Sequence, residues 1–472
     1  MMTEPQEIDD EEHEQIFQRV AAIDVAKASG HVCTRVPHET RPGKRRTRVW
    51  KVGATTKAIL ELADHLVCEG IEMVSVESTS DYWRPFYYLL QARGLSVQLV
   101  NARDVKNVPG RPKTDKLDSV WQAKLTERGM LRPSFVPPPE IRRLRDYTRL
   151  RTDLTGERGR HWQRLEKLLE DALIKVSSVA STMDTLSVRD MLEALIAGER
   201  NPRVLAGLAR GRMRAKHAAL VEALTGQFDD HHAELARLLL DQIDALAGQI
   251  DKLTGRIEEL IAATPAAQPP TDPPHGDHTD STDSADTAHA AHSAHADPEL
   301  PEIPEIPGTA LPAVDRLDEI PGIGRLTAQA MIAEVGLNMA QFPTAAHLVS
   351  WTKFCPQTFQ SGPKTRSGKT GKGNPYLRAA LGEAAAAAAK TDTFLGERYR
   401  RLVKRCGKRK ALVAVGRSIL VIVWHLLADP TARFHDLGPD FYDSRIDKNK
   451  KARNHIRQLQ ALGYRVTLEP AA

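Results

Sequence analysis

Short stretches rich in apolar and β-branched residues recur near the start of the chain and alternate with stretches of helical spacing, in the manner of an α/β fold. Residues 19–37 predict a hairpin with its turn at Ser29–Gly30, and residues 46–53 predict a third strand. Two further apolar stretches, 71–79 and 96–102, predict a fourth and a fifth strand.

Between these later strands the apolar residues recur every three or four positions, which predicts helices over 55–70 and 83–94. Thr55 or Thr56 would cap the first of these helices, and a further helix begins near Thr114. Three strands in hairpin order, followed by alternating helices and strands, are the order expected of a ribonuclease-H-like mixed sheet.

Residues 138–262 keep helical spacing almost throughout. The stretches 144–173 and 232–262 predict two long helices that pack against each other or against a partner chain. The polar face of the first helix is strongly basic. Its arginines are Arg142, Arg143, Arg145, Arg149, Arg151, Arg158, Arg160 and Arg164.

Residues 264–312 are rich in Pro, Asp, Thr, Ala and His and contain no aromatic residue. Such a segment cannot bury enough apolar surface to fold, so it is predicted to be a disordered linker. Its histidines offer a metal-binding alternative, but a solvated linker is the favoured interpretation. They are His275, His278, His289, His292 and His295.

From residue 313 onward the pattern is helical except in a basic, glycine-rich loop, 355–374. The apolar run 411–428 contains Arg417 and His425, so it predicts a buried helix rather than a membrane span. The tail predicts one basic helix and a short final strand.

The composition fits a protein of two or three domains, with 472 residues and a net charge of only +5. An acidic start without an apolar segment gives no secretory signal, so a soluble cytoplasmic protein is expected. The cysteines are scattered and form no CxxC pair, which fits a reducing compartment without a zinc site or disulfide framework. They are Cys33, Cys68, Cys355 and Cys406.

Four acidic residues are candidates for a metal site. Asp24 lies in the first strand, Glu77 closes the fourth, and Asp115 and Asp118 share one face of a helix start. In a ribonuclease-H-like sheet these carboxylates converge, and a divalent cation, Mg²⁺ or Mn²⁺, would relieve their mutual repulsion. The alternatives are a helix-dipole role for the two helical acids and a strand-end cap for Glu77.

The segment Pro321-Gly322-Ile323-Gly324 stands directly before an amphipathic helix. It has the form of a helix-hairpin-helix turn, in which Gly322 and Gly324 would present backbone N–H groups to a DNA phosphate. A plain tight turn between helices is the alternative.

Ser361–Gly362 opens the basic part of the 355–374 loop, which holds no histidine and no G-x-S-x-G motif. Its cations could stabilise a phosphoryl-transfer reaction. From the residues alone, a serine nucleophile and a flexible phosphate-binding loop without a covalent role both remain open. The cations are Lys364, Arg366, Lys369 and Lys372.

Several motifs then match a known family in order: "AAIDVAK", "VESTSDYWRPF", "VNARDVKNVPGRPKTDKLDSVWQAKL", "IPGIGRLTAQAMIAEVG", "FCPQTFQSGPKTRSGKTGKGNPYLRAAL" and "LGYRVTLEP". The chain resembles the insertion-sequence transposases of the one-hundred-and-ten family, outside the acidic tail and the linker. The resemblance implies a RuvC-like domain whose DEDD tetrad is Asp24, Glu77, Asp115 and Asp118. It implies Ser361 as the catalytic serine, with Ser367 as the fallback.

The same resemblance implies a recombinase that cuts and rejoins donor and target DNA through a phosphoserine, guided by a bridge RNA. It implies a tetramer, a dimer of dimers, in which the acids of one protomer meet the serine of another. Basic helices at 142–164 and 398–410 would hold RNA and DNA backbones. No membrane partner is expected, and the protein would join the bacterial nucleoid when it acts.

The expected architecture is α/β plus α: a mixed sheet, a helical coiled-coil middle and a mainly helical C-terminal domain. The predicted boundaries are 1–17 acidic tail, 18–133 RuvC-like domain, 134–263 coiled coil, 264–312 linker, 313–430 transposase domain and 431–472 basic tail.

Two other functions fit the residues. One is a metal-dependent endonuclease that hydrolyses Holliday-type junctions with water, in which Ser361 only contacts phosphate. The other is a non-enzymatic nucleic-acid scaffold or repressor of its own element.

Overall fold

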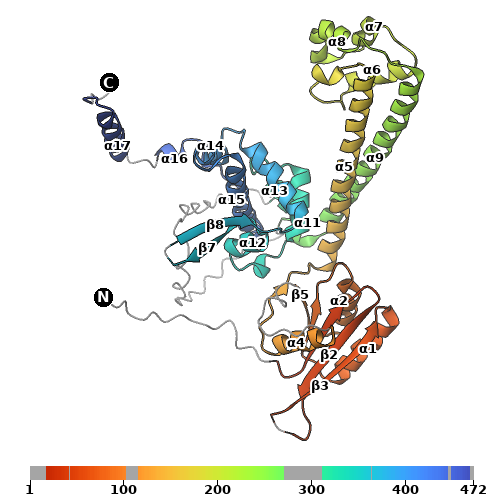
Figure 1. Ribbon diagram of the computed structural model, residues 1–472, viewed down its shortest axis with the longest axis vertical. Helices are drawn as coiled ribbons and strands as arrows, with labels where there is room; N and C mark the ends of the chain where they lie inside the picture. Colours follow the sequence, from red (N-terminus) through yellow and green to blue (C-terminus); the bar gives the residue numbers. More distant parts are fainter. Residues whose placement is uncertain are drawn as a thin grey trace. The chain divides into compact units, whose positions relative to one another are not determined.

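The computed structural model of the protein describes residues 17–41, 43–101, 115–269, 311–362, 364–444 and 448–467 (Figure 1). The chain divides into two compact units, Met1–Pro137 and Pro138–Ala472.

The first unit is built on a mixed sheet of six strands in the order β3-β2-β1-β4-β5-β6. The pairs β1–β4 and β4–β5 are parallel, and the other neighbours are antiparallel. The last strand was not predicted and pairs with β5 through only two residues of each strand. The strands are β1 (Val20–Val25), β2 (Ser29–Pro37), β3 (Arg45–Gly53), β4 (Met73–Glu77), β5 (Val97–Val100) and β6 (Pro133–Ser134).

The first hairpin turns earlier than the sequence predicted. Ser29 already belongs to β2, and the N–H of Ala26 donates to the Ser29 carbonyl at 2.8 Å, so the turn is 26–28. Gly30 serves packing instead: a Cβ there would lie 2.9 Å from Ile23 Cγ2 and 3.1 Å from Phe86 Cζ. The glycine predicted for the turn therefore lies inside the sheet, where close packing leaves no room for a side chain.

Helices cover both faces of this sheet. Helices α1 (Thr56–Cys68) and α2 (Trp83–Ala92) pack on the face that carries Ala21 and Ile23 of β1. Helix α4 (Asp115–Glu127) covers the other face, where Ala123 meets Ala22. Because side chains alternate along a strand, Asp24 shares the face of Ala22.

The second unit begins with two long helices, α5 (Pro139–Asp171) and α9 (Asp230–Ala262), which pack side by side (Figure 1). Each has 33 residues and so extends over about 50 Å. The chain between them forms a helical cap with its own hydrophobic core, so both predicted helices pair within one chain. The cap helices are α6 (Leu186–Ile196), α7 (Pro202–Gly207) and α8 (His217–Ala223).

The rest of the second unit is a helical core around α15 (Lys408–Ala428). By length and composition α15 could cross a membrane, but Val415, Ile419 and Val423 are fully buried in this core. The other helices are α10 (Ala313–Asp318), α11 (Arg325–Val335), α12 (Ala345–Trp351), α13 (Pro375–Ala388), α14 (Phe394–Cys406), α16 (Phe441–Ser444) and α17 (Lys448–Ala461).

The basic glycine-rich segment is not the flexible loop that the sequence predicted. It forms an antiparallel hairpin of β7 (Pro356–Ser361) and β8 (Lys364–Thr370). Threonines and Phe359 favour strands, and Gly362 at φ 57° allows the tight turn between them. The many glycines had concealed this strand pattern.

Two predicted segments of the second unit differ from the structure. The final strand predicted after α17 is absent from the described residues up to 467. The predicted linker begins too early, because Ala267 is buried in the helical core. Its five histidines lie outside the described residues.

Candidate active site

Asp24 and Glu77 stand at the ends of neighbouring parallel strands. The register pairs Ile23 of β1 with Val76 of β4, so Asp24 and Glu77 come next on their strands. Neighbouring strands lie about 4.8 Å apart. Glu77 is 5% exposed and Asp24 is half-buried. Both side chains belong to the face that α4 covers.

Buried polar contacts fix α4 over this face. The hydroxyl groups of Ser75 and Thr126 lie 2.6 Å apart, and Gln122 Nε2 donates to Ser75 Oγ at 3.2 Å. All three side chains are no more than 1% exposed. Because a buried polar group must keep its partner, these contacts define where α4 sits along β4.

The direction of α4 brings its start toward the two strand acids. Phe17, just before β1, donates its N–H to the carbonyl of Glu127 at 3.0 Å, so α4 ends beside the start of β1. Asp118 precedes Gln122 by one turn, about 6 Å. Glu77 follows Ser75 by two residues, about 7 Å in the same direction. Asp118 therefore lies over the strand ends that carry Asp24 and Glu77.

Asp115 is the first residue of α4, three positions before Asp118. Its backbone continues the same helix face toward the strand ends, but its side chain lies outside the described residues.

The chemistry of this region suits a hard divalent cation. The donor atoms are carboxylate oxygens, the ligand type that Mg²⁺ prefers. In addition, Gln122 Oε1 is buried without a hydrogen-bond partner among the described residues, one helical turn from Asp118. A buried acceptor without a donor is costly, and a cation-bound water would supply that donor. The Thr79 hydroxyl donates only weakly to Glu77, at 3.4 Å.

Ser361 lies at the tip of the β7–β8 hairpin, in the second unit. It pairs with Lys364 across the turn, whereas Ser367 pairs with Thr358 farther from the tip. The side chains of both serines and of Lys369 lie outside the described residues. Lys364, Arg366 and Lys372 are exposed.

The turn before α11 has a packing role that the sequence did not reveal. Gly322 has φ 91°, and a Cβ there would lie 2.3 Å from the Ala384 carbonyl oxygen of α13. Glycine is therefore required for this turn to pack on α13. Gly324, the N-cap of α11, is exposed. Phosphate binding at this turn stays a prediction.

Three arginines of α5 do not belong to a solvated basic face. They are Arg145, Arg149 and Arg151, here called the α5 arginines. Arg149 makes two hydrogen bonds to Glu334 at 2.7 and 2.8 Å, and Arg151 donates to Gln329 at 2.6 Å. Arg145 donates to the Ala333 carbonyl at 3.0 Å. Their guanidinium groups are used in contacts with α11, so the basic face predicted for 142–164 is smaller than its arginine count suggests. Nucleic-acid binding by the other arginines of that helix stays a prediction.

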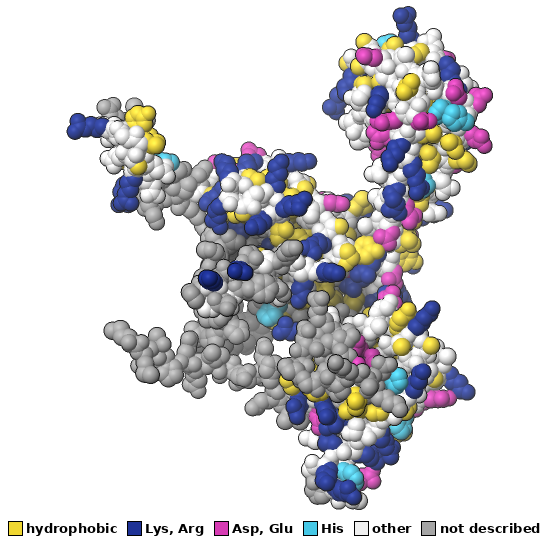
Figure 2. All heavy atoms as spheres, in the orientation of Figure 1, with side chains coloured by type: hydrophobic (Ala, Val, Ile, Leu, Met, Phe, Trp, Pro, Cys, Tyr) yellow, Lys and Arg dark blue, Asp and Glu magenta, His cyan; other side chains and the backbone are white. Residues whose placement is uncertain are grey.

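A different basic region remains exposed where α14 meets α15. Lys and Arg side chains gather over α14 (Figure 2). Five exposed Lys and Arg side chains at this corner form no ion pair with any other described residue. These corner cations are Lys404, Arg405, Lys408, Arg409 and Lys410.

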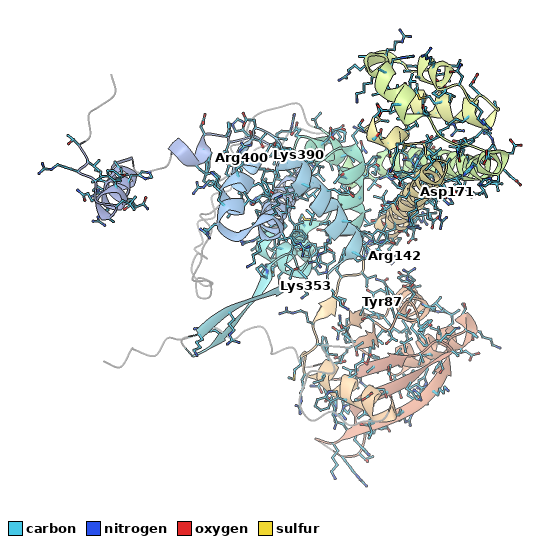
Figure 3. All side chains as sticks on the ribbon, turned by 45° about the horizontal axis from the view of Figure 1, so that its top comes forward. Tyr87, Arg142, Asp171, Lys353, Lys390 and Arg400 are labelled. Carbon is cyan, nitrogen blue, oxygen red and sulfur yellow. The ribbon has the colours of Figure 1, made fainter. Side chains whose placement is uncertain are left out.

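A cluster that the sequence did not suggest lies at the cap end of the helix pair, at Asp171 (labelled in Figure 3). Ligand atoms of Asp171, His231 and His232 lie within 4.8 Å of one another there. His232 Nδ1 accepts from the Asp229 N–H at 3.1 Å, so the ring proton sits on Nε2, 3.4 Å from Asp171. A metal would need that Nε2 lone pair. The contacts therefore assign His232 to capping α9.

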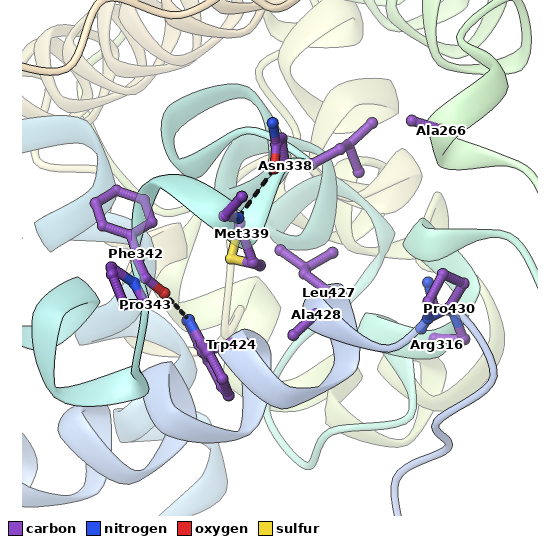
Figure 4. A pocket seen from close by; sticks show the side chains of 12 residues that line it. Ala266, Arg316, Asn338, Met339, Phe342, Pro343, Trp424, Leu427, Ala428 and Pro430 are labelled. Carbon is purple, nitrogen blue, oxygen red and sulfur yellow. Dashed lines mark hydrogen bonds between the residues drawn. The ribbon is translucent and has the colours of Figure 1, made fainter. Parts of the chain in front are cut away.

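A cavity of about 520 Å³ lies beside the end of α15, with Trp424 and Phe342 in its wall (Figure 4). The Trp424 Nε1–H donates to the Phe342 carbonyl at 2.8 Å. Arg316, 4% exposed, donates to the carbonyl of Asp429 at 2.8 Å, and burial lowers its pKa. Arg316 thus satisfies the end of α15, and no residue of the predicted site lines this cavity.

Comparisons with known proteins cover both units. A family model of the DEDD type, described as "Transposase", matches residues 21–174 and spans the four acids. A second, described as "Transposase IS116/IS110/IS902 family", matches residues 314–400 and spans the hairpin.

A relative from Streptomyces coelicolor, the "Insertion element IS110 uncharacterized 43.6 kDa protein", is 31% identical over 140 residues. The match covers 29% of this chain and 32% of that protein, so the chain spans about a third of the relative's length. Two family models in the right order and this relative point to the same group; the first model covers most of the first unit and all of α5, and the second lies within the second unit. The chain belongs to the IS110 family of transposases.

Proposed function

We propose that this protein is an RNA-guided DNA transposase that cuts and rejoins donor and target DNA through a covalent serine intermediate. The observation that carries the proposal is the register of the first unit. Asp24 and Glu77 follow a paired position on neighbouring parallel strands, and the Ser75 contacts set the start of α4 over them. The strand order β3-β2-β1-β4-β5 supports a ribonuclease-H-like, RuvC-like domain.

Asp24, Glu77, Asp115 and Asp118 would hold Mg²⁺ or Mn²⁺. When bound, such a cation stabilises negative charge that develops on a phosphate. The protein's own contribution is to hold acids from two strands and one helix together at the carboxyl ends of β1 and β4. The site is then preorganised and needs no rearrangement during the reaction.

Ser361 would attack the DNA phosphorus through its hydroxyl oxygen. A phosphoseryl ester forms, the bond from phosphorus to the 3′ oxygen breaks, the serine proton passes to a base, and the leaving 3′ oxygen gains a proton. The ester keeps the energy of the broken bond, so a later attack by a 3′-hydroxyl can rejoin the strands without ATP.

Cations near the serine would hold the strand in line for this attack. Lys364, Arg366, Lys369 and Lys372 come from the hairpin and its exit, and the corner cations would hold RNA or DNA backbones. Gly322 and Gly324 are proposed to contact phosphate as well. A bridge RNA would read donor and target by base pairing.

The acids and Ser361 lie in different compact units. We therefore propose a tetramer, a dimer of dimers, in which the acids of one protomer serve the serine of another. The complex would act on the bacterial chromosome in the cytoplasm.

A nicked suicide substrate tests the proposal. We expect the wild-type protein, with bridge RNA and Mg²⁺, to form a covalent DNA adduct that mass spectrometry maps to Ser361. Ser361→Ala, Asp24→Asn and chelation by EDTA should each abolish the adduct, while RNA and DNA binding by the two variants persists.

Other results would contradict the mechanism in different ways. DNA cleavage without any adduct would indicate the hydrolytic junction endonuclease. Transposition that survives both Asp24→Asn and Ser361→Ala would indicate a non-enzymatic scaffold.

A further inference from the structure

One carboxylate in the second unit is almost completely buried and belongs to no part of the mechanism above. Glu334 lies near the end of α11 and is 1% exposed. Two arginines of α5 reach it: Arg149 Nε lies 2.7 Å and Arg145 Nε lies 3.3 Å from its oxygens. Burial by itself would lower the pKa of Arg149, but the hydrogen bonds and charge of Glu334 outweigh it and raise that pKa.

The third partner of Glu334 is Asn374, on the chain that leaves the β7–β8 hairpin. Asn374 Nδ2 donates to Glu334 Oε2. The Asn374 side-chain oxygen accepts from the N–H groups of Tyr376 and Leu377 at 3.0 and 3.3 Å, so the same side chain caps α13. Glu334 with Arg145, Arg149 and Asn374 is here called the Glu334 cluster. It joins α5, α11 and the hairpin exit.

Tyr376 adds a second link between the hairpin exit and α5. Its hydroxyl donates to Asp153 at 3.0 Å, and the Arg149 guanidinium lies 4.9 Å from the centre of its ring. Arg149 therefore touches both the buried acid and the first turn of α13.

The hairpin depends on its base for its direction. Its two strands form a sheet of their own and pair with no other strand of the described chain. At the exit, Arg378 donates to the Gly371 carbonyl at 2.8 Å and to the Thr370 hydroxyl. Gly373 packs so closely that a Cβ would lie 2.3 Å from the Thr352 oxygen, next to Lys353 at the hairpin base (Figure 3).

Stability alone does not explain a buried charge cluster. Replacing a buried ion pair by apolar residues is often neutral or stabilising, because desolvation of the charges offsets their attraction. What charged, bidentate partners add is a defined geometry. Here the geometry that they define is that of the hairpin exit on α5.

We propose that the Glu334 cluster is a positioning device that fixes the direction of the Ser361 hairpin relative to the α5–α9 helix pair. Glu334 and Asn374 are positioning residues in this scheme: they act on the hairpin through its base and do not touch DNA. The hairpin, α5 and α9 all belong to the second unit of the protein. The consequence of this positioning for strand exchange rests on the proposed function of Ser361.

Pulsed dipolar spectroscopy tests the positional claim without nucleic acid. Spin labels at Lys364→Cys, near the hairpin tip, and Arg164→Cys, an exposed site on α5, would report their distance in a Cys68→Ser, Cys355→Ser, Cys406→Ser background. We expect one narrow distance distribution, and Glu334→Gln should broaden it at least about twofold because the arginines lose the charged partner that orients them.

Two further variants keep the result interpretable. Asn374→Ser retains a good helix cap but cannot reach Glu334, so it should broaden the distribution even if Glu334→Gln folds poorly. Glu319→Gln is the matched control, since among the described residues the carboxylate of Glu319 accepts from Arg433 at 2.8 Å and from the Phe434 N–H in the same unit. Unchanged distributions in folded Glu334→Gln and Asn374→Ser, or equal broadening in Glu319→Gln, would overturn the proposal.

The functional consequence has its own measurement. On the suicide substrate, Glu334→Gln and Asn374→Ser should slow adduct formation about tenfold or more while DNA affinity stays within about twofold, because misorientation affects the attack rather than binding. If wild type forms no adduct, the proposed function fails and the distance result still stands. If adduct rates are unchanged although the distribution broadens, the hairpin direction does not limit the reaction, and the catalytic part of the inference is wrong.

Discussion

Two helical segments of this protein are rich in arginine and lysine, and they use their charges in opposite ways. The α5 arginines donate to α11 from partly or fully buried positions. The corner cations, on α14 and α15, stand in solvent without an ion pair among the described residues. In sequence both segments predicted a nucleic-acid surface.

The difference comes from where acceptors lie in the fold. Glu334 and Gln329 are 185 and 178 residues away from the arginines that they bind, so no local pattern links them. A positive charge is available to phosphate only if the fold has not already supplied it with an acceptor. Counting basic residues therefore overstates the number of available cations in both segments, because Arg398 donates to the Tyr442 hydroxyl and Arg400 pairs with Asp392 and Glu397. At the α14–α15 corner the corner cations remain, and their contact with nucleic acid stays a prediction.

The largest expected effect that separates the two segments is on stability. Arg149→Ala should lower the free energy of unfolding of the second unit by about 3 kcal/mol, because Glu334 would stay buried with one arginine fewer. Chemical denaturation followed by circular dichroism measures this change. Lys404→Ala is the matched control and should change stability by less than about 0.5 kcal/mol. Equal losses would erase the distinction.

The next effect is on nucleic-acid binding. Replacing Lys404, Arg405 and Lys408 together by Gln should weaken nucleic-acid binding about tenfold or more in low salt, because three phosphate contacts are lost. The slope of the logarithm of the binding constant against the logarithm of the salt concentration should fall by about one for each lost contact. Fluorescence anisotropy across a salt series measures both quantities. An unchanged salt slope would show that these cations face solvent only.

A smaller effect appears at high pH. Burial, followed by the hydrogen bond to Asp153, raises the pKa of Tyr376 above its ordinary value of 10.0. A raised pKa in the folded state means that stability is fully present below pH 10 and is lost as the pH rises through the folded value. Tyr376→Phe should remove this alkaline loss in thermal unfolding measured between pH 8 and about 11. The same loss in wild type and variant would exclude Tyr376 as its source.

The smallest effect is expected from the exposed arginines elsewhere on α5. Arg143→Gln and Arg164→Gln, at exposed positions, should each change stability by less than about 0.5 kcal/mol. Measuring the nucleic-acid affinity of these two variants shows whether the exposed arginines of α5 contact nucleic acid. Lower affinity with unchanged stability would extend the binding surface to α5.

Local pattern was enough for much of the first unit. Short stretches rich in apolar and β-branched residues located β1 to β5. The cap predicted at Thr55 or Thr56 is Thr55, whose hydroxyl accepts from the Ala58 N–H, and α4 begins one residue after Thr114. Asp24 stood out because a carboxylate inside an apolar strand is costly without a partner. These features depend on residues close in sequence, so propensity and spacing carry them.

By itself, then, the sequence determined β1 to β5, the helices between them, the long helices of the second unit, the positions of the acids in those segments and the family. Only the tertiary structure decided what each side chain faces. In the folded chain Arg149 binds Glu334 and Arg151 binds Gln329. A glycine-rich stretch forms the Ser361 hairpin. Gly30 and Gly322 lie so close to neighbouring atoms that a side chain there would clash. Whether a side chain is buried or paired depends on residues brought together from distant parts of the chain. The free energy of a charged group depends on the solvent exposure and partners that this folding gives it, more than on its neighbours in sequence.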